Sequence, residues 1–218
     1  MATDDKAPKA VPRDEDREDR ELLAEWVAGA SDAGDKLTIR YFRRLRAFFV
    51  HRVSGEHEDL VQETFMQLSK SKQNYRGEAP VRVFVFKIAR YTMLQHLRRV
   101  SRRPEFDTFT SSLCEAYGRR PSSMMAESDE HQILLDALQD IPVMDHDLLT
   151  FYYWVEMTGP ELGDLFNVPV GTIRGRLAAA RKRLRERFEE ISRLPRERMP
   201  TEEAFEMWLR ELSKSSNR

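Results

Sequence analysis

Residues 157–186 read MTGPELGDLFNVPVGTIRGRLAAARKRLRE, and this stretch decides the fold. Thr158 and Glu161 have the spacing of a capping box, in which a Thr hydroxyl and a Glu carboxylate satisfy free amide groups at a helix start. A short helix should begin there and end in a turn at residues 167–169, and a second helix should start at about Val170. Together the two segments predict a helix-turn-helix.

The second helix of this motif has two different faces. An apolar stripe recurs every three or four residues and predicts the side that packs on a core. The stripe consists of Ile173, Leu177, Ala180, Leu184 and Phe188. The opposite side is rich in arginine, and an α-helix fits the major groove of B-DNA. We expect Arg174 and Arg176 to read base edges. The remaining predicted DNA contacts are Thr172, Arg181, Lys182 and Arg185.

Charge is segregated along the chain, although the formal net charge is only −1. Residues 82–103 contain seven basic residues and no acid, and residues 170–187 contain seven basic residues and one acid. Between these runs, residues 129–168 carry nine acids and no Lys or Arg. Two cationic surfaces favour a polyanionic partner, because neutralised phosphates release counterions. Taken alone, either run is explained as well by a solvated basic face.

The rest of the chain predicts an all-α fold of two small helical domains joined by a flexible linker, with the helix-turn-helix in the C-terminal one. Glycine is scarce, at 9 of 218 residues, and apolar residues recur at helical spacing. The linker is rich in Pro and Ser without a period, and the tail lacks large apolar residues. The expected order is a disordered tail over 1–18, a first domain over 19–103, a linker over 104–128, a second domain over 129–190 and an extension over 191–218.

Two helices carry specific expectations. The last helix of the first domain, at about residues 81–100, is expected to bury Phe84, Ile88, Leu97 and either Tyr91 or Leu94. In the C-terminal extension, TEEAFEMWLREL places Phe205, Trp208 and Leu212 on one face. That helix is too short to be stable alone, so it either folds back on the second domain or binds an inhibitor.

Several functional classes are disfavoured by composition. No apolar run approaches the roughly 20 residues that span a bilayer, and the N-terminus lacks a signal-peptide core, so we expect a cytoplasmic protein without membrane insertion. Cys114 is the single cysteine and is interpreted as incidental. The five histidines are scattered, and no metal-binding or nucleophile motif occurs. We therefore expect no enzyme activity, no metal and no cofactor.

The motif at residues 157–186 resembles region 4 of the extracytoplasmic-function (group 4) sigma factors of the sigma-70 family, and its core at residues 169–174 is the most specific part. Upstream, residues 58–65 (EDLVQETF) resemble region 2.2, and the segments at 75–78, 84–90 and 96–99 resemble regions 2.3 and 2.4. The resemblance covers about residues 19–190 in order. Departures include Tyr91 where the family commonly has Asn, and acids at 145 and 147 near a usual basic position.

The resemblance implies a subunit that binds core RNA polymerase, reads the minus-35 element of promoter DNA with the second helix of the motif, and opens the minus-10 element. Docking on the clamp of the polymerase β′ subunit is assigned to Asp59, Gln62 and Glu63. The minus-10 residues are Asn74, Tyr75, Arg76, Lys87, Arg90, Arg98 and Arg99. Tyr75 is equally consistent with a core aromatic. Members of this family are commonly inhibited by an anti-sigma partner. The alternative function is a stand-alone helix-turn-helix regulator that does not bind core polymerase.

Overall fold

The computed structural model describes residues 13–50, 52–53, 55–101, 107–117, 129–192 and 199–215. Within this part of the chain the secondary structure is helical, and one isolated bridge joins Ser112 to Pro142. The predicted all-α class is confirmed. The first 12 residues of the expected tail, and most of the expected linker, lie outside the described residues.

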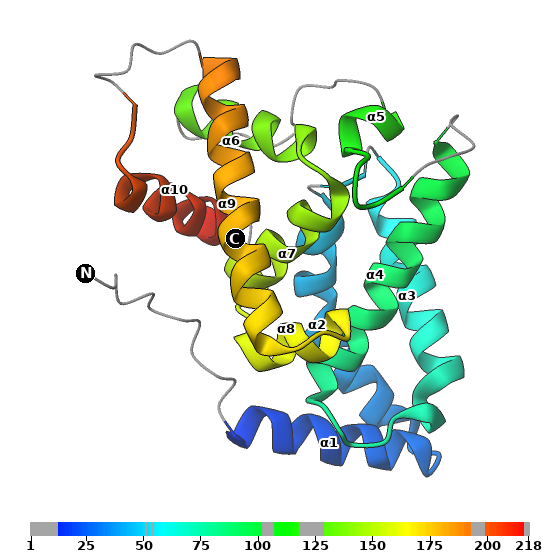
Figure 1. Cartoon of the computed structure of the whole chain (residues 1–218). Helices are drawn as coiled ribbons and strands as arrows, with labels where there is room; N and C mark the ends of the chain where they lie inside the picture. Colours follow the sequence, from blue (N-terminus) through cyan, green and yellow to red (C-terminus); the bar gives the residue numbers. More distant parts are fainter. Residues whose placement is uncertain are drawn as a thin grey trace.

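The N-terminal half contains α1–α4 and the short 3-10 helix η1. Their bounds are α1 Arg13–Val27, α2 Ser31–Val50, α3 His57–Ser71, η1 Lys72–Asn74 and α4 Val81–Val100. Helix α1 packs on α2, α2 on α3, and α3 on α4. In Figure 1, α1 lies at the bottom, and α3 and α4 run side by side at the right.

Helix α1 begins at Arg13, before the expected end of the tail at residue 18. Its first charged residues have partners that are distant in the sequence. The Val81 amide donates to Asp16 Oδ1 at 3.1 Å, which satisfies a free amide at the start of α4. Arg44 Nη2 lies 2.8 Å from Glu15 Oε1. The charged residues at the start of α1 therefore form an ion pair with α2 and a hydrogen bond with α4, which a local pattern does not reveal.

The C-terminal half contains α6–α10, and α5 lies between the halves. The bounds are α5 Leu113–Tyr117, α6 Asp129–Asp140, α7 Val143–Tyr153, α8 Gly159–Phe166, α9 Val170–Ser192 and α10 Glu202–Ser215. The long helix α9 packs against α6, α7 and α8, and α10 contacts α7. Figure 1 shows α10 (red) beside α9 (orange), on the side away from α4. None of the described helices is both long and apolar enough to cross a membrane.

The two halves share one continuous hydrophobic core. Phe48 of α2 stacks on Phe151 of α7, with ring centroids 5.2 Å apart. Phe86 of α4 meets the same Phe151 ring edge-on at 5.8 Å. Since all three side chains are buried, the C-terminal half is packed directly on α2 and α4 through α7.

The buried side of α4 differs from the predicted stripe. The fully buried apolar residues are Val81, Val83, Val85, Phe86, Ala89, Met93 and Leu97. Of the predicted residues, Phe84, Ile88 and Leu94 are partly buried, Leu97 is buried, and Tyr91 is 59% exposed. The single-stripe prediction was wrong because α4 contacts α1, α2 and α3 on one side and α5 and α8 on another, so more than one face is covered.

Part of the expected linker, residues 107–117, packs on the core. The Val143 amide donates to Ser111 O at 2.9 Å, and the Met144 amide donates to Thr108 O at 2.8 Å, so this segment satisfies free amides at the start of α7. Leu113 of α5 is buried. A helix of five residues is too short to leave a periodic signal in the sequence.

Candidate nucleic-acid interface

The helix-turn-helix forms at the predicted residues. The Thr158 amide donates to Glu161 Oε2 at 2.8 Å, and the Glu161 amide donates to Thr158 Oγ1 at 3.5 Å, so both bonds of the capping box are present at the start of α8. Asn167 adopts the left-handed conformation that ends α8. A Cβ built on Gly163 would lie 3.0 Å from the Val168 carbonyl oxygen, so glycine permits the close turn.

The first turns of α9 present an open basic surface. Thr172 and Arg174 are exposed, Arg176 is half-exposed, and the core stripe from Ile173 to Phe188 is buried as predicted. Neither arginine forms an ion pair with any residue that the structure describes. A Cβ built on Gly175 would meet no atom within 4 Å. This end of the helix is therefore free to approach a polyanion closely.

In the second half of α9, two arginines pair with carboxylates of the same half of the protein. Arg183 Nη2 donates to Asp145 Oδ1 at 3.0 Å, and Arg187 Nε donates to Asp140 Oδ2 at 2.8 Å. These carboxylates raise the pKa of both guanidinium groups, mainly through the hydrogen bonds themselves. Acids of the run at residues 129–168 thus neutralise part of the basic run at residues 170–187.

The predicted phosphate contacts of α9 fall into two groups. Lys182 is exposed and lies 3.8 Å from Glu186 one turn away. Arg185 Nη2 donates to the Pro200 carbonyl oxygen at 2.9 Å, and Arg181 Nη1 donates to the Tyr153 hydroxyl oxygen at 3.4 Å. Of these three side chains the lysine is the most accessible to DNA, because it is 78% exposed.

Helix α10 folds back on the C-terminal half, which was one of its two expected roles. Phe205, Leu209 and Leu212 are buried, and the Trp208 ring centroid lies 5.9 Å from that of Phe188. Glu206 of α10 accepts a hydrogen bond from the Tyr153 hydroxyl at 3.1 Å. Burial raises the pKa of Tyr153, so this hydroxyl remains a donor.

The basic run of α4 also divides into two parts. Lys87, Arg98 and Arg99 are exposed, as a DNA contact requires. Arg90, which was also predicted to hold DNA, instead donates from Nε to Asp147 Oδ2 at 2.9 Å, and its guanidinium lies 4.9 Å from the centroid of the Phe166 ring. Arg82 Nε donates to Glu161 Oε1 at 2.7 Å. The first part of the run therefore binds the helix-turn-helix half.

Besides Arg90, Asp147 binds a second arginine, which the sequence pattern did not indicate. Arg52, which follows α2, is fully buried and donates from Nε to Asp147 Oδ1 at 3.3 Å. Its guanidinium also lies 4.1 Å from the centroid of the Phe48 ring. Burial lowers the pKa of Arg52 to about 10, against the opposing effect of Asp147, so the group stays charged at neutral pH. In the sequence, the one indication of this contact is an arginine close to the end of a helix.

In the loop after α3, Tyr75 makes contacts of the kind that a packed aromatic makes. Its hydroxyl donates to the Ala79 carbonyl oxygen at 2.7 Å, and its ring centroid lies 5.3 Å from that of Phe84. Tyr75 is thus a half-buried packed aromatic, whereas its neighbours Asn74 and Arg76 are exposed. Of the predicted minus-10 residues in the loop, these two neighbours are the ones that a DNA strand can reach without displacing packed side chains.

The predicted polymerase-binding residues lie on an accessible face of α3. Asp59 and Gln62 are exposed. The Glu63 side chain is 40% exposed, and its Oε2 lies 3.5 Å from Arg99 Nη2 at the end of α4. An exposed ion pair of this kind contributes little stability, so both groups can exchange partners.

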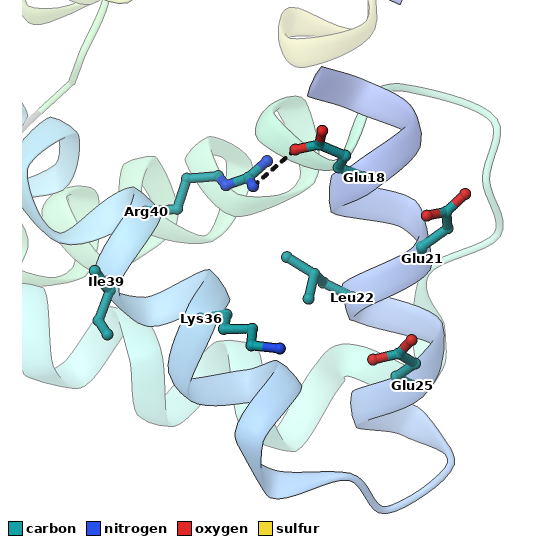
Figure 2. Close-up of a pocket in the computed structure, with 7 residues that line it drawn as sticks. All are labelled: Glu18, Glu21, Leu22, Glu25, Lys36, Ile39 and Arg40. Carbon is teal, nitrogen blue, oxygen red and sulfur yellow. Dashed lines mark hydrogen bonds and ion pairs between the residues drawn. The ribbon is translucent and has the colours of Figure 1, made fainter. Parts of the chain in front are cut away.

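A separate groove lies between α1 and α2 and has a volume of about 610 Å³. Figure 2 shows Leu22 and Ile39 among side chains of both charges, with an ion pair of 3.0 Å between Glu18 and Arg40. The other lining residues are Glu21, Glu25 and Lys36. No group of three His, Cys, Asp or Glu side chains within the described residues is arranged to hold a metal ion. The groove resembles a contact surface more than a reaction centre.

Comparison with known proteins finds the same family that the sequence resembles. The family model of sigma-70 region 2 matches residues 38–103. The RNA polymerase sigma-H factor of Pseudomonas aeruginosa is 27% identical over 186 residues, which cover 81% of this chain and 96% of that protein. The ECF RNA polymerase sigma-E factor of Haemophilus influenzae is 25% identical over 185 residues, with coverages of 79% and 96%.

The fold also matches a solved structure, that of CnrH in complex with the cytosolic domain of CnrY. The TM-score is 0.57 at 19% sequence identity, and the match covers 79% of this chain and 98% of that one. At this identity the similarity concerns the fold.

Proposed function

We propose how this chain, an alternative RNA polymerase sigma factor of the extracytoplasmic-function type, engages its two macromolecular partners. The exposed face of α3 binds core polymerase, the start of α9 reads the minus-35 element, and the end of α4 with the loop after α3 contacts the minus-10 element. The sigma factor supplies binding and positioning, and the polymerase carries out the chemistry. The complex forms in the cytoplasm, where promoter DNA is available.

One observation carries the proposal. The same chain contains a sigma-70 region 2 over residues 38–103 and, about 55 residues later, a helix-turn-helix whose first arginines are unpaired among the described residues. A stand-alone regulator needs only the second of these features. Their combination favours a factor that joins DNA recognition to polymerase recruitment.

The minus-35 contact follows from the geometry of α9. Arg174 and Arg176 lie within the first two turns of a helix that begins at Val170; Arg174 is exposed and Arg176 is half-exposed. The forked guanidinium of Arg can donate to both O6 and N7 of a guanine, which discriminates it from other bases by about 1–3 kcal/mol. Thr172 and Lys182 are placed to contact the flanking phosphates.

The minus-10 contact uses side chains that remain exposed in this structure. Arg98 and Arg99 occupy the last turn of α4, and Lys87 lies three turns earlier. Asn74 and Arg76 extend the polar surface into the loop after α3. A strand that has left the duplex is held by such cationic and polar groups, and Tyr75 supports the loop by packing beneath it.

Polymerase binding is assigned to the exposed carboxylate and amide of α3. Asp59 and Gln62 are free to pair with basic groups of the β′ clamp, and Glu63 can exchange Arg99 for a partner arginine. We also propose that an anti-sigma protein inhibits the factor, as the family resemblance implies. CnrH, which shares the fold, was solved with the cytosolic domain of another protein.

The test is run-off transcription with core polymerase and a pool of genomic fragments. The wild-type protein should direct specific transcripts, and Asp59→Arg combined with Glu63→Arg should abolish them by preventing polymerase binding. Ser69→Ala, an exposed change near the end of α3, serves as control. A protein that binds a DNA site alone but never yields transcripts with core polymerase would instead be a stand-alone regulator.

A further inference from the structure

The exposed side of α4 carries one aromatic residue among cations. Within this helix the exposed positions are Lys87, Tyr91, Arg98 and Arg99, and every other residue is buried or half-buried. Tyr91 is 59% exposed, although neighbouring helices cover two sides of α4. At 3.6 residues per turn, the four exposed side chains lie within roughly a third of the helix circumference. We call these four residues the α4 stripe.

The α4 stripe is open to a ligand. Lys87, Tyr91 and Arg98 form no hydrogen bond or ion pair with any residue that the structure describes. Arg99 lies 3.5 Å from Glu63 of α3, in an exposed ion pair that contributes little stability. The ring and its flanking cations can therefore bind a ligand without giving up a contact within the described chain.

Exposure alone does not identify a contact residue, because single apolar side chains are common on protein surfaces. Phe42 of α2 is 44% exposed, but an exposed acid, Asp35, lies two turns before it on the same face. Tyr91 instead lies between cations. At 1.5 Å per residue, Lys87 is about 6 Å before it along the helix axis and Arg98 is about 10.5 Å beyond it. Alternating rings and cations match a single nucleic-acid strand, in which bases stack and phosphates carry the charge.

We propose that Tyr91 stacks on one unpaired base of the minus-10 element, and that Lys87 and Arg98 bind the phosphates on either side of that base. The proposal rests on the proposed function, in which the end of α4 contacts this element. Nothing in the resemblance assigns a role to Tyr91, since the family commonly has Asn at this position. The inference comes from the exposed ring and its place in the α4 stripe.

Stacking adds what the cations alone do not supply. A phosphate can be bound in paired or unpaired DNA, whereas a base presents its face to a side chain only after the strand has left the duplex. A contact shifts an equilibrium only when it differs between the two states. Tyr91 should therefore stabilise the opened promoter, and because the ring carries no charge, its contact should not depend on salt as the phosphate contacts do.

The experiment compares variants of the full chain bound to core polymerase. Tyr91→Ala removes the ring, Tyr91→Phe keeps the ring without its hydroxyl, and Tyr91→Asn keeps a polar group without the ring. Phe42→Ala is the matched control, since it removes an exposed ring from α2. Each complex is bound to two forms of a promoter fragment recovered by run-off transcription. One form is a bubble with a mismatched minus-10 element, and the other is a paired duplex at low temperature, whose pairing is checked with permanganate.

Loss of the stacked base should weaken binding to the bubble by about 5- to 140-fold, the equivalent of 1–3 kcal/mol at 1.4 kcal/mol per factor of ten. Tyr91→Ala and Tyr91→Asn should show this loss, whereas Tyr91→Phe and Phe42→Ala should stay within twofold of wild type. Duplex binding and the salt slope on the bubble should be unchanged in all four variants.

A fluorescent base analogue locates the contact. 2-Aminopurine is moved through the bubble one position at a time, and its fluorescence falls when it stacks. At one position it should be quenched by wild type and by Tyr91→Phe, and it should be brighter there with Tyr91→Ala and Tyr91→Asn. Quenching that is the same in all forms would place the stacked base on another residue and overturn the assignment.

The outcomes are separable. If Tyr91→Phe binds the bubble as weakly as Tyr91→Ala, the hydroxyl makes the contact and the stacking role is overturned. Equal losses on bubble and duplex would overturn it too, because a ring that only supports α4 does not distinguish the two forms. Circular dichroism checks the fold, and if Tyr91→Ala does not fold, the comparison of Tyr91→Phe with Tyr91→Asn still decides. A wild-type protein that binds neither form together with core polymerase would contradict the proposed function instead.

Discussion

Helices α4 and α9 carry the two basic runs of the chain, but they use arginine in opposite order. In α4 the early arginines, Arg82 and Arg90, bind acids of the C-terminal half, and the late Arg98 is exposed. In α9 the early Arg174 is exposed, and the late Arg187 binds Asp140. Each helix is therefore half structural and half available to a ligand.

This difference shows that a run of basic residues does not by itself reveal which arginines bind acids within the protein and which face solvent. Guanidinium groups that face a neighbouring carboxylate hold helices together, and those that face solvent can neutralise phosphates. The acidic run between the two helices determines which arginines are used inside the protein. Its residues Asp140, Asp145 and Asp147 form ion pairs with some arginines of each basic run and leave the others exposed to solvent. Substitutions of single arginines should separate their use in stability from their use in DNA binding.

The largest expected effect is on DNA recognition. Arg174→Ala combined with Arg176→Ala should weaken binding of the polymerase complex to the minus-35 element by about 2–6 kcal/mol, because two base contacts are lost. Stability should change by less than about 0.5 kcal/mol, since Arg174 is exposed, Arg176 is half-exposed and neither forms an ion pair within the described chain. Electrophoretic mobility shift with matched and scrambled upstream elements measures the loss. Equal weakening on both DNAs would show that these arginines contact only the backbone.

The complementary change is Arg187→Ala at the other end of α9. The loss of a partly buried, charge-assisted hydrogen bond to Asp140 should lower the free energy of unfolding by about 1–2 kcal/mol. Binding to the minus-35 element, measured at a temperature where the variant is folded, should stay within twofold of wild type. Urea denaturation gives the first quantity. A loss of DNA affinity larger than the loss of stability would place Arg187 in the interface.

A smaller effect is expected from Arg98→Ala on α4. An exposed arginine that contacts one phosphate should reduce the salt slope of promoter binding by about one, and it should weaken binding uniformly across sequences. Titration of binding against salt concentration measures this slope. Arg46→Ala, an exposed position on α2, is the control. An unchanged slope would leave Arg98 outside the minus-10 contact.

The smallest effect concerns acid stability. Burial alone would raise the pKa of Glu161, but its bonds with Arg82 and Thr158 outweigh burial and lower the pKa below its ordinary value of 4.5. A lowered carboxylate pKa contributes stability that is present above the ordinary value and lost as the pH falls below it. The denaturation midpoint should therefore drop as the pH falls below about 4.5, and Glu161→Gln should flatten that drop.

Much of the fold could be predicted because its signals are local. The capping box at Thr158 and the turn at Asn167 lie within ten residues, so the helix-turn-helix and the buried stripe of α9 follow from spacing alone. The burial of α4 did not follow, because packing on two sides erases a single stripe. The early start of α1 depends on partners in α2 and α4, which no window of sequence contains.

The positions of the candidate site residues could likewise be predicted only in part. The exposure of Arg174 on α9 and of Asp59 on α3 could be predicted, because each lies opposite an apolar stripe of its own helix. The burial of Arg90 could not, since its partner Asp147 is 57 residues away and a charge pattern does not specify a pair. Arg52 was missed for the same reason.

The bond between Arg52 and Asp147 also has a consequence for synthesis of the protein. The two residues are 95 positions apart, and a ribosome that adds 5–20 residues per second needs roughly 5–20 s to make the chain between them. During that interval α3 and α4 are made, and the carboxylate that pairs with Arg52 does not yet exist. The guanidinium of Arg52 can therefore become buried with its partner only after α7 has been made.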